Sequence, residues 1–117
     1  MNVMIPKSRK ISRKDFPQDF HKCFKYHSPS LFLLVKKQEN NTMRSRFSVV
    51  VSKKVSKSAV SRVLLKRRAY NIIKAKVENI KPGFLCVFYF KKGSERLGFN
   101  DVEKEMVQLL NKAKITN

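Results

Sequence analysis

The residues best suited to chemistry are cations gathered at one junction of the chain, where a short apolar run passes into a long basic segment. Lysine and arginine neutralise phosphates, and the amide groups at a helix N-terminus strengthen that attraction. Each phosphate neutralised steepens the salt dependence of binding by roughly 0.7 to 0.9 log units per log unit of salt. This grouping predicts contacts to a nucleic-acid backbone by Lys53, Lys54, Lys57, Arg62, Lys66, Arg67 and Arg68.

The same sequence offers little for catalysis or metal binding. A metal-dependent nuclease needs carboxylates that converge on its cations, but the Asp and Glu residues are scattered, and Glu103 and Glu105 point in different directions on a predicted helix. His21 and Cys23 do not share a helix face, which argues against a zinc site there. The three glycines form no phosphate-cradling pattern. We therefore predict no catalytic residue, no metal ligand and no cofactor held by the chain itself.

The charge balance indicates a polyanionic partner. The chain carries 27 Lys and Arg against 8 Asp and Glu, a formal net charge of +19. This excess costs self-repulsion in the folded state unless a polyanion neutralises it. Nucleic acid fits better than a membrane surface, because the cations are spread along the chain rather than confined to one amphipathic helix. No apolar run is long enough for a signal peptide or a membrane span, so we expect a cytoplasmic protein with reduced cysteines and no evident obligate protein partner.

The cationic junction is typical of a strand, a loop and a helix. The alternation in residues 46–52 suits a mostly buried strand. Ser56 and Ser58 are candidate N-caps, and about 21 helical residues can follow before Pro82. Residues 84–90 are apolar throughout, which favours a central strand covered on both faces. Strand, helix and strand in this order predict a crossover that joins two parallel strands.

The N-terminal part of the chain predicts a short helix from Phe16 or Pro17 to Lys25. Phe16, Phe20 and Phe24 recur every four residues and would share one face of that helix. Such a stripe belongs either to the core or to a groove against the sheet where bases or sugars stack. Both interpretations are compatible with the sequence.

The remaining segments complete the predicted order. A strand at 31–35, followed by a polar connection, predicts an antiparallel hairpin with the strand at 46–52. A final helix begins at an Asn100 cap. The fold class is α/β (α+β), a two-layer sandwich with the element order α-β-β-α-β-α. We expect residues 1–14 to be a flexible basic arm and residues 15–117 to form a single RNA-binding α/β domain.

The strand–loop–helix segment resembles the protein subunit of bacterial ribonuclease P. That family typically shows an arginine-bearing Val-rich strand, a Ser-Lys-Lys-Val stretch, an Ala-Val linker and an arginine-asparagine-arginine signature before a Lys-Arg-rich helix. The matching residues here are Arg46 to Val51, Ser52-Lys53-Lys54-Val55, Ala59-Val60, Arg62-Val63-Leu64 and Lys66-Arg67-Arg68. The signature is retained only at Arg62, because Val63 and Leu64 replace its asparagine and second arginine.

The resemblance implies a fold whose strand–helix–strand crossover is left-handed, although about 98% of such crossovers are right-handed. It implies that the basic helix and its preceding loop dock on a catalytic RNA. It also implies that a cleft between the first helix and the sheet, lined by Phe16, Phe20, Arg46 and Ser48, holds the 5′ leader of precursor tRNA. The RNA and its Mg²⁺ ions would do the chemistry, and the protein would be the non-catalytic subunit of a ribozyme endoribonuclease that matures tRNA 5′ ends.

Two other functions remain open at this stage. A general RNA-binding module on a similar fold, associated with the ribosome, would bind unrelated structured RNAs with comparable affinity. A protein-only nuclease would cleave precursor tRNA without an RNA component.

Overall fold

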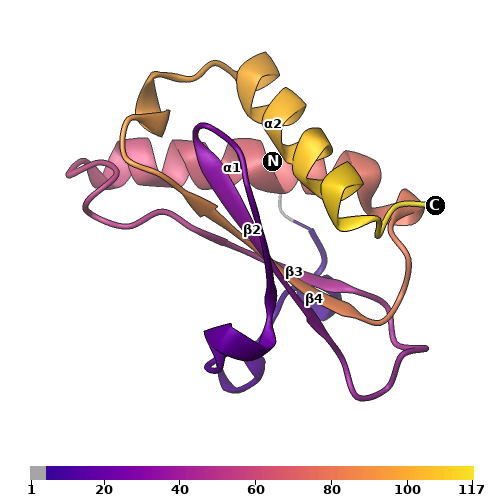
Figure 1. Cartoon of the computed structure of the whole chain (residues 1–117). Helices are drawn as coiled ribbons and strands as arrows, with labels where there is room; N and C mark the ends of the chain where they lie inside the picture. The colour runs from indigo at the N-terminus through magenta and orange to yellow at the C-terminus, as the bar shows by residue number, and fades with distance from the viewer. Residues whose placement is uncertain (1–4) are drawn as a thin grey trace.

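The computed structural model describes residues 5–117 and shows a four-stranded sheet with two α-helices (Figure 1). This mixed arrangement confirms the predicted fold class. The elements are β1 (Phe24–His27), β2 (Leu31–Lys37), β3 (Arg46–Val50), α1 (Ala59–Lys76), β4 (Phe84–Phe90) and α2 (Phe99–Ala113). Short 3₁₀ turns occur at Lys7–Arg9, Arg13–Asp15, Phe20–Lys22, Val77–Asn79 and Ser94–Arg96.

The strand β4 occupies the interior of the sheet, whose order is β1-β2-β4-β3. It pairs antiparallel with β2 and parallel with β3, where Phe47 lies opposite Cys86 and Val49 opposite Phe88. The predicted central strand and the predicted parallel crossover through α1 are therefore confirmed. The left hand of that crossover stays a prediction.

The predicted hairpin between β2 and β3 is wrong, because β4 lies between these two strands. Sequence neighbours often pair, but a strand that is apolar on both faces is best buried in the middle of a sheet. The connection from β2 to β3 passes around the start of β4 instead. There the Gly83 amide donates to the Met43 carbonyl at 2.7 Å, and the Gln38 amide donates to the Gly83 carbonyl at 2.8 Å.

Both helices cover the same face of the sheet, as Figure 1 shows. The predicted Ser58 cap of α1 is confirmed, since its hydroxyl accepts a hydrogen bond from the Ser61 amide at 3.2 Å. α2 begins earlier than predicted, with Gly98 rather than Asn100 as its cap residue. In the described part of the chain, no helix is both long and apolar enough to cross a membrane. The residues that the helices bury are Leu65, Ala69, Tyr70, Ile72 and Ile73 from α1, and Val102, Met106, Leu109 and Leu110 from α2.

The predicted helix over residues 16–25 is wrong. Phe16 is extended because a residue before proline avoids the helical region, and the chain then makes a 3₁₀ turn before it enters β1. Strand β1 pairs with β2 in a hairpin, which satisfies backbone groups that a helix would have satisfied internally. Phe20 and Phe24 are 44% and 59% exposed, so the three phenylalanines form no buried stripe.

Residues 5–14 lie along the outer edge of β3. The Ile11 amide donates to the Phe47 carbonyl at 3.0 Å, and the buried Arg9 side chain donates to the Ser45 carbonyl at 3.0 Å. The flexibility of an arm ending at residue 14 stays a prediction, and the first four residues of that arm lie outside the described part of the chain.

Gly83 provides a test of this strand order. Its φ is +99°, and an added Cβ would lie 2.8 Å from the Asn41 carbonyl oxygen in the connection around β4. We expect Gly83→Ala to lower the free energy of unfolding by about 3 kcal/mol, from backbone strain plus the clash. Gly93 is the matched control, since its φ is +95° and nothing lies within 4 Å of its added Cβ. Gly93→Ala should lower the free energy of unfolding by about 1 kcal/mol. Urea titration of both variants measures the two values. An equal decrease in the two variants would contradict the close approach of Gly83 to Asn41.

Candidate nucleic-acid interface

The face of the sheet that turns away from the helices combines polar side chains with an apolar strip. Lys36, Leu85 and Arg46 lie side by side on β2, β4 and β3. Two residues further along the same face, Leu34 and Val87 are 1% and 0% exposed. Since α1 and α2 cover the opposite face, another segment must cover this one.

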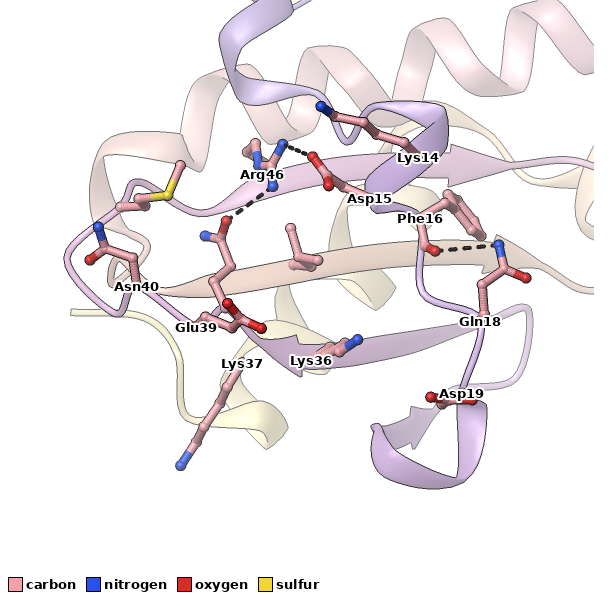
Figure 2. A pocket seen from close by; sticks show the side chains of 13 residues that line it. Lys14, Asp15, Phe16, Gln18, Asp19, Lys36, Lys37, Glu39, Asn40 and Arg46 are labelled. Carbon is pink, nitrogen blue, oxygen red and sulfur yellow. Dashed lines mark hydrogen bonds and ion pairs between the residues drawn. The ribbon is translucent and has the colours of Figure 1, made fainter.

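That segment is the stretch of chain that leaves the outer edge of β3 and leads to the start of β1. It crosses over the strands on its way (Figure 2). Its start is tied to β3, where Asp15 contacts Arg46. Its end reaches β4, where the Phe20 ring meets the Tyr89 ring edge-on with 6.3 Å between centroids. The segment therefore covers part of the apolar strip and leaves a hollow beside it.

The hollow has a volume of about 700 Å³ and lies where β2 ends and β3 begins (Figure 2). Cations from three segments line it together with three carboxylates, and the Phe16 side chain lies at one side. Such a mixture of ammonium, guanidinium and ring surfaces suits a nucleic-acid strand. The lining residues are Lys14, Asp15, Phe16, Gln18, Asp19, Lys36, Lys37, Gln38, Glu39, Asn40, Met43, Arg46 and Leu85.

Arg46 is held firmly at this site. Its guanidinium donates to the Asp15 carboxylate at 3.0 Å and to the Gln38 side-chain oxygen at 3.2 Å, and its side chain is 18% exposed. Its buried Nε has no hydrogen-bond partner within residues 5–117. The hydrogen bonds from Arg46 and from Ser12 lower the pKa of the Asp15 carboxyl below its ordinary value.

The four residues predicted to line a leader cleft are not all brought together. Phe16 and Arg46 both line the hollow. Ser48 lies on the same sheet face two positions along β3 but does not line it, and Phe20 lies against Tyr89 instead. Sequence reasoning missed the cations that β2 contributes. The sequence feature that could have revealed them is that Lys36 and Lys37 directly follow an apolar strand and so continue it. In the sheet, Lys36 lies opposite Leu85.

A second polar surface lies at the other end of β3, in the loop that leads to α1. Lys53, Lys54 and Lys57 are exposed there, while Val55 is buried and anchors the loop. These lysines line a shallow hollow of about 470 Å³, to which the β4–α2 connection adds Lys92 and Glu95. Lys92 was not predicted, because 38 residues separate it from Lys53 in the sequence and only the folded sheet brings the two loops together.

The predicted cations of α1 divide into two pairs with different roles. Arg62 donates to the carbonyls of Ser56 and Lys57 at 2.8 and 3.0 Å, and it thereby holds the lysine loop in place. Arg68 donates to the Leu97 carbonyl at 2.9 Å and fixes the β4–α2 connection. Lys66 and Arg67 are exposed and make no side-chain hydrogen bond within residues 5–117.

The two cysteines are poorly suited to nucleophilic chemistry. Burial raises the pKa of the Cys86 thiol to about 12, and burial also raises the pKa of Cys23, so neither thiol is activated as a nucleophile. Both cysteines are free. Within the described residues, no three His, Cys, Asp or Glu side chains gather closely enough to hold a metal ion.

Comparison with known proteins gives one consistent family. The sequence model described as Ribonuclease P matches residues 5–114. The ribonuclease P protein component of Clostridium botulinum (strain Langeland) is 32% identical over 117 residues, covering 95% of this chain and 99% of the relative. The component from Pseudanabaena sp. is 29% identical over 113 residues, covering 96% and 97%.

Solved structures agree with this result. The RNase P protein from Thermotoga maritima superposes with a TM-score of 0.74 at 26% identity, covering 86% of this chain and 92% of that chain. The Staphylococcus aureus RNase P protein gives a TM-score of 0.78 and covers 100% of both chains. Its identity of 18% limits that likeness to the fold.

The ion pair at the first hollow predicts a titration. We expect Asp15 in the native protein to titrate below its ordinary pKa of 3.8, because Arg46 stabilises the carboxylate. A lowered folded-state pKa contributes stability that is present above the unfolded pKa and is lost as pH falls through the folded one. Carboxyl carbon NMR should show the pKa of Asp15 rising toward 3.8 in Arg46→Gln and staying clearly lowered in the control Lys14→Gln. An unchanged pKa in Arg46→Gln would contradict the ion pair.

Proposed function

This chain belongs to the ribonuclease P protein family, and from that premise we propose that it binds the catalytic RNA of ribonuclease P together with the 5′ leader of precursor tRNA. Its relatives are named as protein components, so the enzyme in which it takes part is a complex. In this proposal the RNA and its Mg²⁺ ions carry out the cleavage, and the protein positions RNA.

The observation that carries the proposal is a long segment of one charge sign. No Asp or Glu occurs between Glu39 and Glu78, although this stretch contains β3, the lysine loop and all of α1. A solvated surface usually mixes both signs, so a stretch with cations alone favours a polyanion. We assign the catalytic RNA to the surface formed by Lys53, Lys54, Lys57, Lys66 and Arg67.

Arg62 and Arg68 serve the same surface indirectly. Arg62 donates hydrogen bonds to backbone carbonyls of the lysine loop. Arg68 donates one to a backbone carbonyl of the β4–α2 connection. Their charges remain next to the RNA surface, because neither guanidinium meets a carboxylate within 4.0 Å among the described residues. They are positioning residues whose charges also add to the positive electrostatic potential of this surface.

The 5′ leader is assigned to the hollow at the start of β3. A single strand needs cations along its phosphates and a flat surface for its bases, and the hollow supplies Lys14, Lys36 and Lys37 with Phe16. This hollow and the lysine loop lie at opposite ends of β3. One protein could thus bind its catalytic RNA and its substrate without competition between them.

The direct experiment is cleavage of a precursor tRNA by a bacterial ribonuclease P RNA at low Mg²⁺. RNA strands repel one another when Mg²⁺ is scarce, and a protein of charge +19 reduces that repulsion. We expect the protein to increase the initial rate of cleavage at the mature 5′ end, measured on gels with end-labelled substrate. Lys53→Ala with Lys54→Ala should reduce the increase without unfolding the domain, because both side chains are exposed.

Three controls separate the proposal from the other functions. Protein with precursor tRNA alone should give no cleavage, since cleavage there would indicate a protein-only nuclease. A substrate with mature 5′ end should bind the complex more weakly than one with a leader. Failure to stimulate, together with equal affinity for an unrelated structured RNA, would contradict the proposal and favour a general RNA-binding module.

A further inference from the structure

The N-terminal half of α1 carries an apolar hollow in the midst of the cationic surface. Val60, Val63 and Leu64 are 78%, 49% and 46% exposed, although most other Val and Leu side chains among the described residues are buried. Their spacing of three and four residues places them on one side of the helix. With Ala59 and Arg67 they line a hollow of about 380 Å³. A contiguous exposed apolar surface of this kind is a common mark of a binding site.

The surroundings of this hollow restrict what it can bind. Arg67 forms one wall, Lys57 and Lys66 are exposed nearby in the sequence, and no carboxylate occurs between Glu39 and Glu78. A second copy of the chain would bring its own charge of +19 to the contact, which opposes self-association. Three exposed aliphatic side chains also provide far less than the roughly 800 Å² per partner of a stable protein interface.

The ligand must therefore combine negative charge with a small apolar surface. An unpaired nucleotide does so, because its phosphates are anionic and the face of its base is apolar. A volume of about 380 Å³ is at the low end of the roughly 300–1,000 Å³ of small-ligand sites, which suits one base. Bases that are splayed out of an RNA helix commonly stack on arginine side chains, and Arg67 is one of the residues that line the hollow.

We propose that the hollow formed by Ala59, Val60, Val63, Leu64 and Arg67 binds an unpaired nucleobase of the RNA that docks on α1. The inference rests on the proposed function, which places RNA on this helix. It gives Val63 and Leu64 a role as apolar contacts, at the two positions where the arginine-asparagine-arginine signature is not retained. The base packs against the aliphatic side chains and Arg67, and Lys66 takes a flanking phosphate.

The test compares two blunt-ended duplex RNAs with the same number of nucleotides and phosphates, one fully paired and one with single-nucleotide bulges. Val63 and Leu64 are about half exposed, so the double variant Val63→Ala, Leu64→Ala removes apolar surface that only a ligand can bury. We expect this variant to bind the bulged RNA on the order of tenfold more weakly, and the paired RNA within about twofold of wild type. Alanine favours helices, so the thermal unfolding midpoint should be maintained.

Salt dependence provides a second readout, because an apolar contact releases no counterions. The slope of log K against log salt should be unchanged in the double variant, whereas the matched control Lys66→Ala should reduce it by about 0.7 to 0.9 on both RNAs. The control tests the RNA surface itself and the double variant tests the base site. If Lys66→Ala leaves both the RNA affinity and the salt slope unchanged, and the protein does not stimulate cleavage, the proposed function itself is contradicted.

Three results would overturn the base site while leaving the proposed function intact. The first is wild-type affinity of the double variant for bulged RNA, which would leave the hollow to a protein partner. The second is an equal loss of affinity for the paired and bulged RNAs. The third is a dimer of the wild-type protein in sedimentation velocity that the double variant dissociates, since a second copy of the chain would then occupy the hollow.

Discussion

The rest of the structure depends on a single constraint, the need to cover β4 on both faces. Cys86 and Phe88 on one face and Leu85 and Val87 on the other are all 6% exposed or less. α1 and α2 cover the first face, as their apolar stripes require. The second face is covered by the chain between Asp15 and β1, whose described residues form 3₁₀ turns rather than an α-helix and cross the strands. Because this cover is incomplete, a hollow lined by both cations and carboxylates remains beside it.

The distribution of the few carboxylates explains how such a basic chain keeps open cationic surfaces. Asp15 is paired with Arg46, Glu105 accepts from the Ser28 hydroxyl at 2.6 Å and the Ser30 amide at 2.8 Å, and Asp101 accepts from the Gly98 amide at the start of α2. These acids hold connections together and leave most lysines without an anionic neighbour. In the described residues, two ion pairs lie within 4.0 Å. The repulsion that results is the cost of a surface suited to RNA.

Local signals predicted the parts of the fold that depend on local chemistry. The Ser58 cap and the double-sided apolar strand β4 follow from side chains within each segment, and both are present. The order of the strands depends on which strand takes the place beside β2, and β4 takes it instead of β3. The short connection between β2 and β3 gives no sign of this. The N-terminal helix was wrong for a similar reason, since Phe24 begins a strand that pairs with β2. The hollow at Arg46 likewise joins Asp15 and Lys36 across long stretches of sequence.

The proposed separation of two RNA-binding surfaces on one small sheet can be tested by lysine footprinting. Lysine acetylation would be measured by mass spectrometry on the protein alone, with a bacterial ribonuclease P RNA, and with that RNA plus precursor or mature tRNA. We expect the catalytic RNA alone to protect Lys53, Lys54, Lys57 and Lys66. Lys14, Lys36 and Lys37 should become protected when a tRNA with a 5′ leader is added, and should remain reactive with mature tRNA. Protection of both groups of lysines by the catalytic RNA alone would show that the two surfaces are not separate.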